Sequence, residues 1–132
     1  MRLVVIDDAE VLRSVVELVS RDLGHEVVAR AETLSDALAA LAALATAGIA
    51  VDAILLDGRL PGPGTIAEVV AALVAAATAV PILTIAALDE RETLRAACAA
   101  GATGGVLRPL SHAGLATALA RLDGDGDRPS PP

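Results

Sequence analysis

The 132-residue sequence predicts a doubly wound α/β fold, in which a parallel five-stranded sheet carries helices on both faces. Three observations support this fold class. Short apolar runs and longer helical segments alternate five times along the chain. The apolar runs are rich in valine, leucine and isoleucine, and they lack the strict alternation of a half-exposed strand, as expected of strands buried on both faces. Polar residues and glycines mark the boundaries between the two kinds of segment.

Each apolar run has the length of a short strand. The five runs are residues 3–6 (LVVI), 26–31 (EVVARA), 53–56 (AILL), 81–86 (PILTIA) and 104–107 (GGVL). Because a helical segment separates every run from the next, the strands are expected to lie parallel. With 55% hydrophobic residues and no aromatic residue, the core around them must be aliphatic.

The segments between and after the strands have the composition of helices. They are residues 9–23, 33–47, 65–77, 89–100 and 111–122. Polar residues at three of their starts are typical N-caps: Thr33, Asp89 and Ser111. Glycines that favour a helix stop follow three of them: Gly24, Gly48 and Gly101.

The length fits one domain, which we place at residues 1–122. Residues 123–132 (DGDGDRPSPP) are polar and rich in proline and glycine, so they predict a disordered tail or the start of a linker. The lone Cys98 lies in an alanine-rich helical run with no histidine nearby. This context favours a buried structural thiol over a nucleophile.

Charge and hydropathy argue against two classes of partner. A net charge of −7 leaves no basic patch for direct nucleic-acid binding. Residues 69–88 carry no charge over a length that would span a membrane, but they are alanine-rich, and Pro81 divides them into a helix and a strand. The N-terminal MRLVVIDD lacks the long apolar core of a signal peptide. We therefore expect a cytoplasmic protein that does not enter a membrane.

Acidic residues follow two of the predicted strands. Asp7 and Asp8 end the first strand, Asp57 ends the third, and Arg108 ends the fifth. Ligands bind beyond the carboxyl ends of the strands in an open parallel sheet, and three carboxylates gathered there repel one another unless a cation is bound. An all-oxygen site with open positions favours Mg²⁺. Two simpler interpretations stay open, with Asp8 as a helix N-cap and Asp57 as an Asx-turn residue.

Four segments together carry a resemblance to a known family. They are VVIDDAE (4–10), LLDGRLPGPG (55–64), PILTIAA (81–87) and GATGGVLRPL (101–110). Over residues 2–122 the sequence resembles the receiver domain of two-component response regulators, the single-domain chemotaxis type and its relatives. The family pattern Asp-x-x-Met/Leu-Pro stands here as Asp57, Leu60 and Pro61. The resemblance implies a flavodoxin-like three-layer (βα)5 sandwich with strand order 2-1-3-4-5.

The resemblance also implies a role for each site residue. Asp57 would be the phosphoacceptor of a Mg²⁺-dependent phosphorelay, receiving its phosphoryl group from a histidine kinase, a phosphotransfer protein or a small phosphodonor. Asp7, Asp8, Asp57 and the backbone carbonyl of Arg59 would bind Mg²⁺, and Arg108 would contact a phosphoryl oxygen. Such a domain is a signalling module and not an enzyme. It acts on an output protein or a fused output domain, which the sequence does not identify.

Three positions depart from the family pattern. Ala86 stands where the family has a Thr or Ser hydroxyl that bonds the phosphoryl group, and Thr84 lies roughly 7 Å further back along the strand. Arg108 replaces a lysine and is larger, although it keeps the charge. Gly105 stands where many relatives have a tyrosine or phenylalanine, so an aromatic switch is excluded. The side chain of Arg59 either lies over the phosphoryl group or is simply exposed.

Two interpretations of function remain. In the first, the domain accepts a phosphoryl group on Asp57 and signals through an atypical readout. In the second, it is a pseudo-receiver that docks partners without phosphorylation. The three converging acids favour the first, since a domain that is never phosphorylated has no evident need for them.

The sequence fits other classes of α/β protein less well. A hydrolase of the haloacid-dehalogenase type needs a second aspartate where Arg59 stands. A serine hydrolase needs Gly-x-Ser-x-Gly, and a dinucleotide-binding unit needs a glycine-rich loop after the first strand. The face formed by the fourth helix, the fifth strand and the fifth helix is the usual output surface of receivers, and a homodimer through it is an open alternative. It offers Arg91, Arg95, Leu107 and Leu110.

Overall fold

The computed structural model describes residues 1–60, 62 and 64–127, and it confirms the predicted flavodoxin-like architecture. Five parallel strands form one sheet in the order β2-β1-β3-β4-β5. The strands are β1 (Arg2–Ile6), β2 (Glu26–Ala31), β3 (Ala53–Asp57), β4 (Ile82–Ala87) and β5 (Gly104–Arg108). The order reverses between β1 and β3, so the carboxyl ends of these two strands define the switch point of the sheet.

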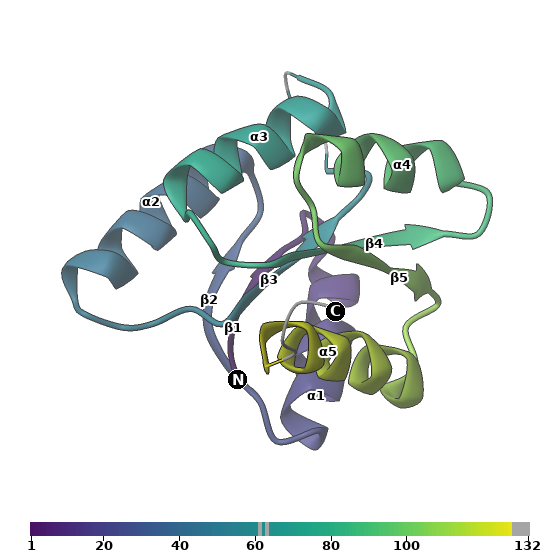
Figure 1. Cartoon of the computed structure of the whole chain (residues 1–132), viewed down its shortest axis with the longest axis horizontal. Coiled ribbons are helices and arrows are strands. Elements are labelled where there is room, and N and C mark those ends of the chain that lie inside the picture. Colours follow the sequence, from purple (N-terminus) through teal and green to yellow (C-terminus); the bar gives the residue numbers. More distant parts are fainter. Residues whose placement is uncertain (61, 63, 128–132) are drawn as a thin grey trace.

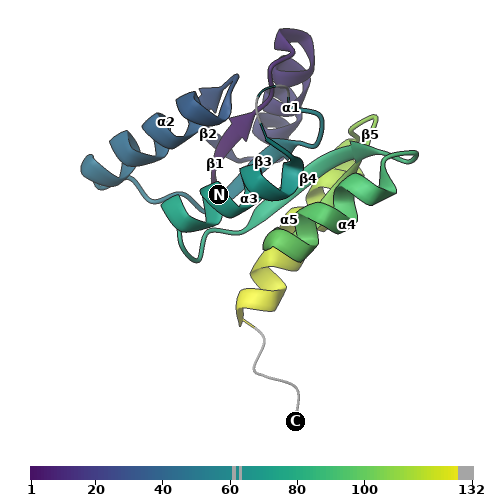
Figure 2. The same ribbon diagram turned by 90° about the horizontal axis from the view of Figure 1, so that it is seen from above.

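Five helices cover the sheet on both sides, as the alternation of segments predicts. They are α1 (Glu10–Asp22), α2 (Leu34–Thr46), α3 (Ile66–Ala76), α4 (Arg91–Ala100) and α5 (His112–Asp127). Helices α2, α3 and α4 lie on one face, and α1 and α5 lie on the other (Figure 1). Seen from above, α2, α3 and α4 follow one another across the sheet (Figure 2). The molecule therefore has three layers, and its aliphatic core consists of two layers of side chains, one on each face of the β-sheet.

The two core layers decide where the side chains at the strand ends point. Leu3 and Val5 of β1 and Leu55 of β3 face the layer under α1 and α5, whereas their neighbours in sequence face the opposite layer. Successive side chains of a strand alternate between faces. Continuing this alternation places Asp7 and Asp57 on the α1/α5 side, at the same edge of two hydrogen-bonded strands.

Helix boundaries agree with the sequence at some ends and differ at others. The side chain of Thr33 caps α2 and that of Ser111 caps the start of α5, as predicted. The predicted cap at Asp89 is wrong, because α4 begins one residue later than that cap requires and its N-cap is Glu90. Helix α5 continues to Asp127, beyond the predicted end at residue 122. The last five residues of the predicted tail, 128–132, lie outside the described part of the chain.

The predicted burial of Cys98 is also wrong. Its side chain is exposed, whereas the preceding residue, Ala97, is fully buried against the sheet. One residue along a helix turns the side chain by about 100°, which is enough to exchange the inner for the outer face. Cys98 lies on the same face of α4 as Arg91 and Arg95, which are also exposed, so the spacing of these residues indicates its position better than the alanine-rich composition does.

The uncharged run 69–88 contains most of α3 and all of β4, as the position of Pro81 predicts. Within the described residues, no helix has both the length and the apolar character needed to cross a membrane. Gly24, Gly48 and Gly101 follow α1, α2 and α4 with φ of +87°, +73° and +123°, values that glycine adopts most readily.

Candidate functional site

The three predicted acids meet at the switch point of the sheet. Asp7 and Asp8 follow β1, and Asp57 is the last residue of β3. One carboxylate oxygen from each lies within 4.8 Å of the other two. Asp7 and Asp57 are each only 4% exposed, whereas Asp8 is open to solvent. The cluster therefore combines two buried carboxylates with one that faces water.

Backbone amides orient the two buried carboxylates. The N–H of Ala9 donates to Asp7 Oδ1 at 2.9 Å, and the N–H of Arg59 donates to Asp57 Oδ1 at 3.0 Å. Both bonds have the two-residue spacing of an Asx turn, so this simpler interpretation of Asp57 holds alongside its place in the cluster. The other simple interpretation is wrong, because the N-cap of α1 is Ala9 and Asp8 makes no capping bond.

Arg108 reaches the same cluster from β5. Its Nη2 donates to Asp57 Oδ1 at 2.6 Å and to the carbonyl oxygen of Ile85 at 3.2 Å. The Arg108 side chain is 14% exposed, and the peptide bond between it and Pro109 is cis. Its Nη1 is buried without a hydrogen-bond partner among the described residues. A buried donor without a partner is costly, and an oxygen-rich ligand beside Asp57 would satisfy it.

Burial makes the cluster electrostatically unfavourable without a cation. Desolvation raises the pKa of Asp7 above its ordinary value, and the negative charges of Asp57 and Asp8 raise it further. The hydrogen bond from Ala9 and the positive charge of Arg108 lower this pKa, but they do not offset the rise. The donor set is entirely carboxylate oxygen, and it includes one solvent-facing acid. These residues fit a hard divalent cation that keeps several water ligands.

The end of β4 lacks the hydroxyl that the family resemblance predicts. Ala86 is fully buried and pairs with Leu107 of β5. Thr84, two residues earlier, pairs with Leu56 and Gly105 inside the sheet. Its hydroxyl is buried and has no hydrogen-bond partner within the described residues.

The position of the missing aromatic residue is occupied by a leucine from α4. A Cβ atom added at Gly105 would lie 2.8 Å from Leu94 Cδ2, closer than such atoms approach in proteins. Leu94 therefore packs where a side chain at position 105 would have to begin. The sequence indicates the absence of an aromatic residue but not what fills its place.

Glu90 belongs to this end of the sheet and was not anticipated from the sequence. Its Oε1 accepts a 2.6 Å hydrogen bond from the N–H of Ala87, and its Oε2 lies 3.5 Å from Nε of Arg59. The Arg59 side chain, 59% exposed, is thus paired with Glu90 rather than unattached. The only local signal is a glutamate three residues after a strand end, a spacing at which side chain and backbone often bond.

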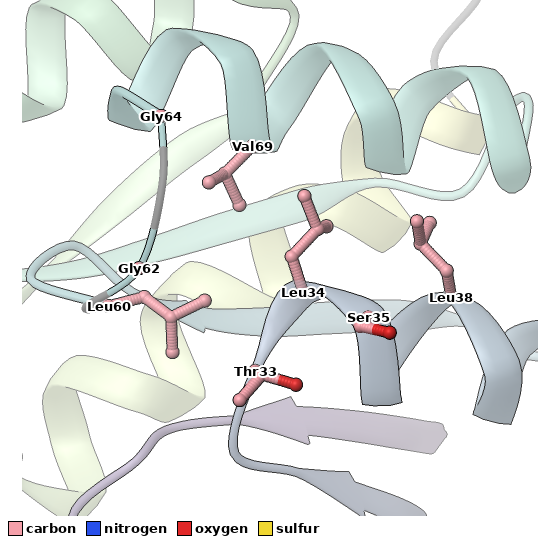
Figure 3. A pocket seen from close by; sticks show the side chains of 8 residues that line it. All are labelled: Thr33, Leu34, Ser35, Leu38, Leu60, Gly62, Gly64 and Val69. Atoms are coloured by element: carbon pink, nitrogen blue, oxygen red, sulfur yellow. The ribbon is translucent and has the colours of Figure 1, made fainter.

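A separate apolar groove of about 340 Å³ lies between α2 and the residues that lead from β3 into α3. Figure 3 shows Leu34, Leu38, Leu60 and Val69 turned toward it. No charged residue lines the groove, so it offers none of the chemistry of the acidic cluster. Pro61, the last residue of the predicted family pattern, lies outside the described residues.

The doubly wound fold with an acidic cluster at its switch point is the architecture of a known class of signalling domain, and comparisons with known proteins identify the family. The family model for the response regulator receiver domain matches residues 3–120. The chain belongs to this family, whose members are signalling modules that pair with histidine kinases and are not catalytic enzymes. The search of curated protein sequences gave no significant match.

Solved structures with the same fold cover nearly the whole chain. A two-component response regulator of the LuxR family from Aurantimonas is 29% identical with a TM-score of 0.74, covering 93% of this chain and 85% of that one. A chemotaxis response regulator of Vibrio cholerae is 28% identical with a TM-score of 0.70, covering 92% and 97%. The receiver domain of a sensor histidine kinase from Pseudomonas aeruginosa, solved with magnesium in its active-site cleft, is 24% identical with a TM-score of 0.76, covering 93% and 97%.

Proposed function

We propose that this domain receives a phosphoryl group on Asp57 in a Mg²⁺-dependent phosphorelay. The observation that carries the proposal is the convergence of Asp7, Asp8 and Asp57 within 4.8 Å, with Arg108 directly on Asp57. A buried carboxylate beside a cation site and a guanidinium has the surroundings that phosphoryl transfer requires. The phosphodonor is a histidine kinase or a phosphotransfer protein, and the compartment is the cytoplasm.

In the transfer, a carboxylate oxygen of Asp57 attacks the phosphorus atom of a phosphohistidine. The new O–P bond forms as the P–N bond breaks, and the imidazole leaves with the electron pair. Asp57 Oδ1 already accepts bonds from Arg59 and Arg108, whereas Oδ2 accepts none among the described residues, so we assign the attack to Oδ2. Arg108 stays in contact with the acceptor, and its unpartnered Nη1 provides a donor for a phosphoryl oxygen.

Asp7, Asp8, Asp57 and the backbone carbonyl of Arg59 would hold the Mg²⁺ ion. When bound, the ion neutralises charge on the phosphoryl oxygens. The raised pKa of Asp7 supports this assignment, since a neighbouring cation offsets the repulsion that raises it. The magnesium bound in the Pseudomonas aeruginosa receiver domain supports it by analogy.

A second function is favoured by the end of β4. Ala86 is fully buried and offers no hydroxyl to report a change at Asp57, whose Oδ1 is already bound by Arg108 at 2.6 Å. Under this alternative the domain is a pseudo-receiver that binds its output partner whether or not Asp57 is modified. The exposed Leu107 and the exposed Arg95 would contribute to the output face, through which a homodimer is the alternative assembly.

The two functions are separated by incubating the protein with Mg²⁺ and a small phosphodonor, and weighing it by mass spectrometry. The phosphorelay function predicts the mass of one added phosphoryl group in the wild type and none in Asp57→Asn. Absence of the adduct, together with absence of beryllofluoride binding at millimolar Mg²⁺, would establish the pseudo-receiver. An adduct that persists in Asp57→Asn would show that the acceptor is wrongly assigned.

A further inference from the structure

Glu90 places a largely buried carboxylate between the two loops that flank Asp57. The carboxylate is 15% exposed and bridges the backbone N–H of Ala87, after β4, to the guanidinium of Arg59, after β3. The bond to Ala87 is short at 2.6 Å, whereas the contact with Arg59 is longer at 3.5 Å and lies at the solvent edge. Of the two contacts, the one with Arg59 is therefore the easier to break.

Each partner of Glu90 is connected to the proposed phosphoacceptor, Arg59 directly and Ala87 through Arg108. The backbone N–H of Arg59 donates to Asp57 Oδ1. Ala87 pairs across the sheet with Arg108, whose guanidinium bonds the same oxygen. A change of charge on Asp57 therefore acts directly on the backbone of Arg59, and it acts on Ala87 through Arg108.

Glu90 is also the residue from which α4 starts. Its N–H donates to the carbonyl of Ala87 at 2.9 Å, and its own carbonyl accepts from the N–H of Leu94 at 3.2 Å. Side chain and backbone of Glu90 together close the turn 87–90. Any force that pulls Arg59 away leaves this buried carboxylate without its cation and weakens the turn on which the first residues of α4 depend.

We propose, on the basis of the phosphorylation proposed above, that Glu90 is a positioning residue that holds the Arg59 guanidinium away from Asp57, and that Arg59 changes partner when Asp57 is phosphorylated. A phosphoryl group carries nearly two negative charges in place of the single charge of the Asp57 carboxylate, and it brings three acceptor oxygens two residues from Arg59. That group is the stronger partner for a guanidinium. The exchange carries the signal to α4 without a hydroxyl at Ala86.

The test measures the affinity for beryllofluoride, an acyl-phosphate mimic, in the presence of Mg²⁺ by isothermal titration calorimetry. Glu90→Gln keeps an acceptor for Ala87 but loses the charge that holds Arg59. It should bind beryllofluoride roughly two- to fivefold more tightly, the range expected of a half-exposed ion pair. The matched control Glu92→Gln, on the same helix and paired with Arg95 at the surface, should leave the affinity unchanged.

The same substitution in an Arg59→Ala background distinguishes the partner exchange from a general effect of the Glu90 charge on beryllofluoride affinity. In Arg59→Ala the further change Glu90→Gln should have no effect on affinity, because the group that Glu90 restrains is gone. An equal gain in the presence and absence of Arg59 would overturn the inference, as would equal affinities of wild type and Glu90→Gln. Both results leave the proposed function standing, because the proteins still bind beryllofluoride.

Backbone ¹H–¹⁵N NMR gives a readout that a merely structural role of Glu90 would not produce. In the wild type, beryllofluoride should shift the amide resonances of Ala87 and of residues 91–94. In Glu90→Gln, much of this shift should already be present before beryllofluoride is added. If the wild type binds beryllofluoride tightly but the amide resonances of Ala87 and α4 do not shift, the partner exchange of Arg59 is refuted and the proposed function is not. If no variant binds beryllofluoride, wild type included, the proposed function itself fails and the inference fails with it.

Discussion

The ion pair between Arg108 and Asp57 makes a quantitative prediction about stability. Asp57 is only 4% exposed in the wild type, and Arg108→Ala removes the guanidinium from this carboxylate while the buried carboxylate of Asp7 stays beside it. Removing one partner of a buried ion pair costs roughly 3–5 kcal/mol. Because Arg108 retains 14% exposure and water can enter the space it leaves, we expect about 3 kcal/mol, near the lower end of that range.

The variant should nevertheless fold. A chain of 132 residues has a free energy of unfolding of roughly 7–20 kcal/mol at the usual 0.05–0.15 kcal/mol per residue. Urea unfolding followed by far-UV circular dichroism is the appropriate assay, since the chain contains no aromatic residue to serve as a fluorescent probe. Mg²⁺ should stabilise Arg108→Ala by more than it stabilises the wild type, because the cation replaces part of the lost positive charge.

A double-mutant cycle tests the cause of this loss. In the Asp57→Asn background the change Arg108→Ala should cost much less, since the amide needs no counter-charge. An equal loss in both backgrounds would refute the electrostatic explanation and leave packing of the arginine stem as the cause. A loss below about 1 kcal/mol in the wild-type background would place the pair among weak surface contacts.

Three further predictions concern single side chains. Burial raises the pKa of Asp7 in the folded protein, so the wild type is relatively more stable below the unfolded pKa and loses this stability as pH rises through the folded pKa. Asp7→Asn should therefore be more stable than the wild type at pH 7 but not at pH 3, as measured by urea unfolding without Mg²⁺. Arg30 lowers the pKa of Glu17. The free energy of unfolding of Glu17→Gln should therefore be about 1 kcal/mol below that of the wild type at pH 7, and little below it at pH 3, where the wild-type carboxylate is protonated. Gly105→Tyr should lower the thermal midpoint through its clash with Leu94, and Leu94→Ala should restore part of it.

The fold and the acidic cluster are predictable from the sequence because both depend on strong local contrasts. A run such as AILL followed by Asp57 marks a buried strand and its end at once. Parallel pairing then brings the ends of neighbouring strands to one edge without further information. The places of Asp7 and Asp57 therefore follow from periodicity and topology alone.

The errors at α4 have two causes, a pattern that composition alone does not reveal and contacts between distant segments. Cys98 follows Arg95 by three residues and Arg91 by seven, which places it on the charged face of α4. Helical periodicity therefore indicates its exposure, whereas the alanine-rich composition of the run does not. The cap of α4 moves from Asp89 to Glu90 because the turn after β4 is closed by the Glu90 side chain. The contact of Glu90 with Arg59 joins loops from two different βα units, and no spacing rule connects them.

The charges at this end of the sheet explain why a cation and a phosphoryl group would act in opposite directions. Four carboxylates, those of Asp7, Asp8, Asp57 and Glu90, meet the guanidinium groups of Arg59 and Arg108, which leaves a formal charge of −2. Arg13 also bonds the backbone carbonyl of Asp7, but its ion pair with Glu32 is neutral and does not change this total. One divalent cation balances this charge. A phosphoryl group on Asp57 makes the site negative again, and of the two arginines only the one held by Glu90 is not already bound to Asp57 through its guanidinium. The charge count therefore singles out Arg59 as the group with most reason to move.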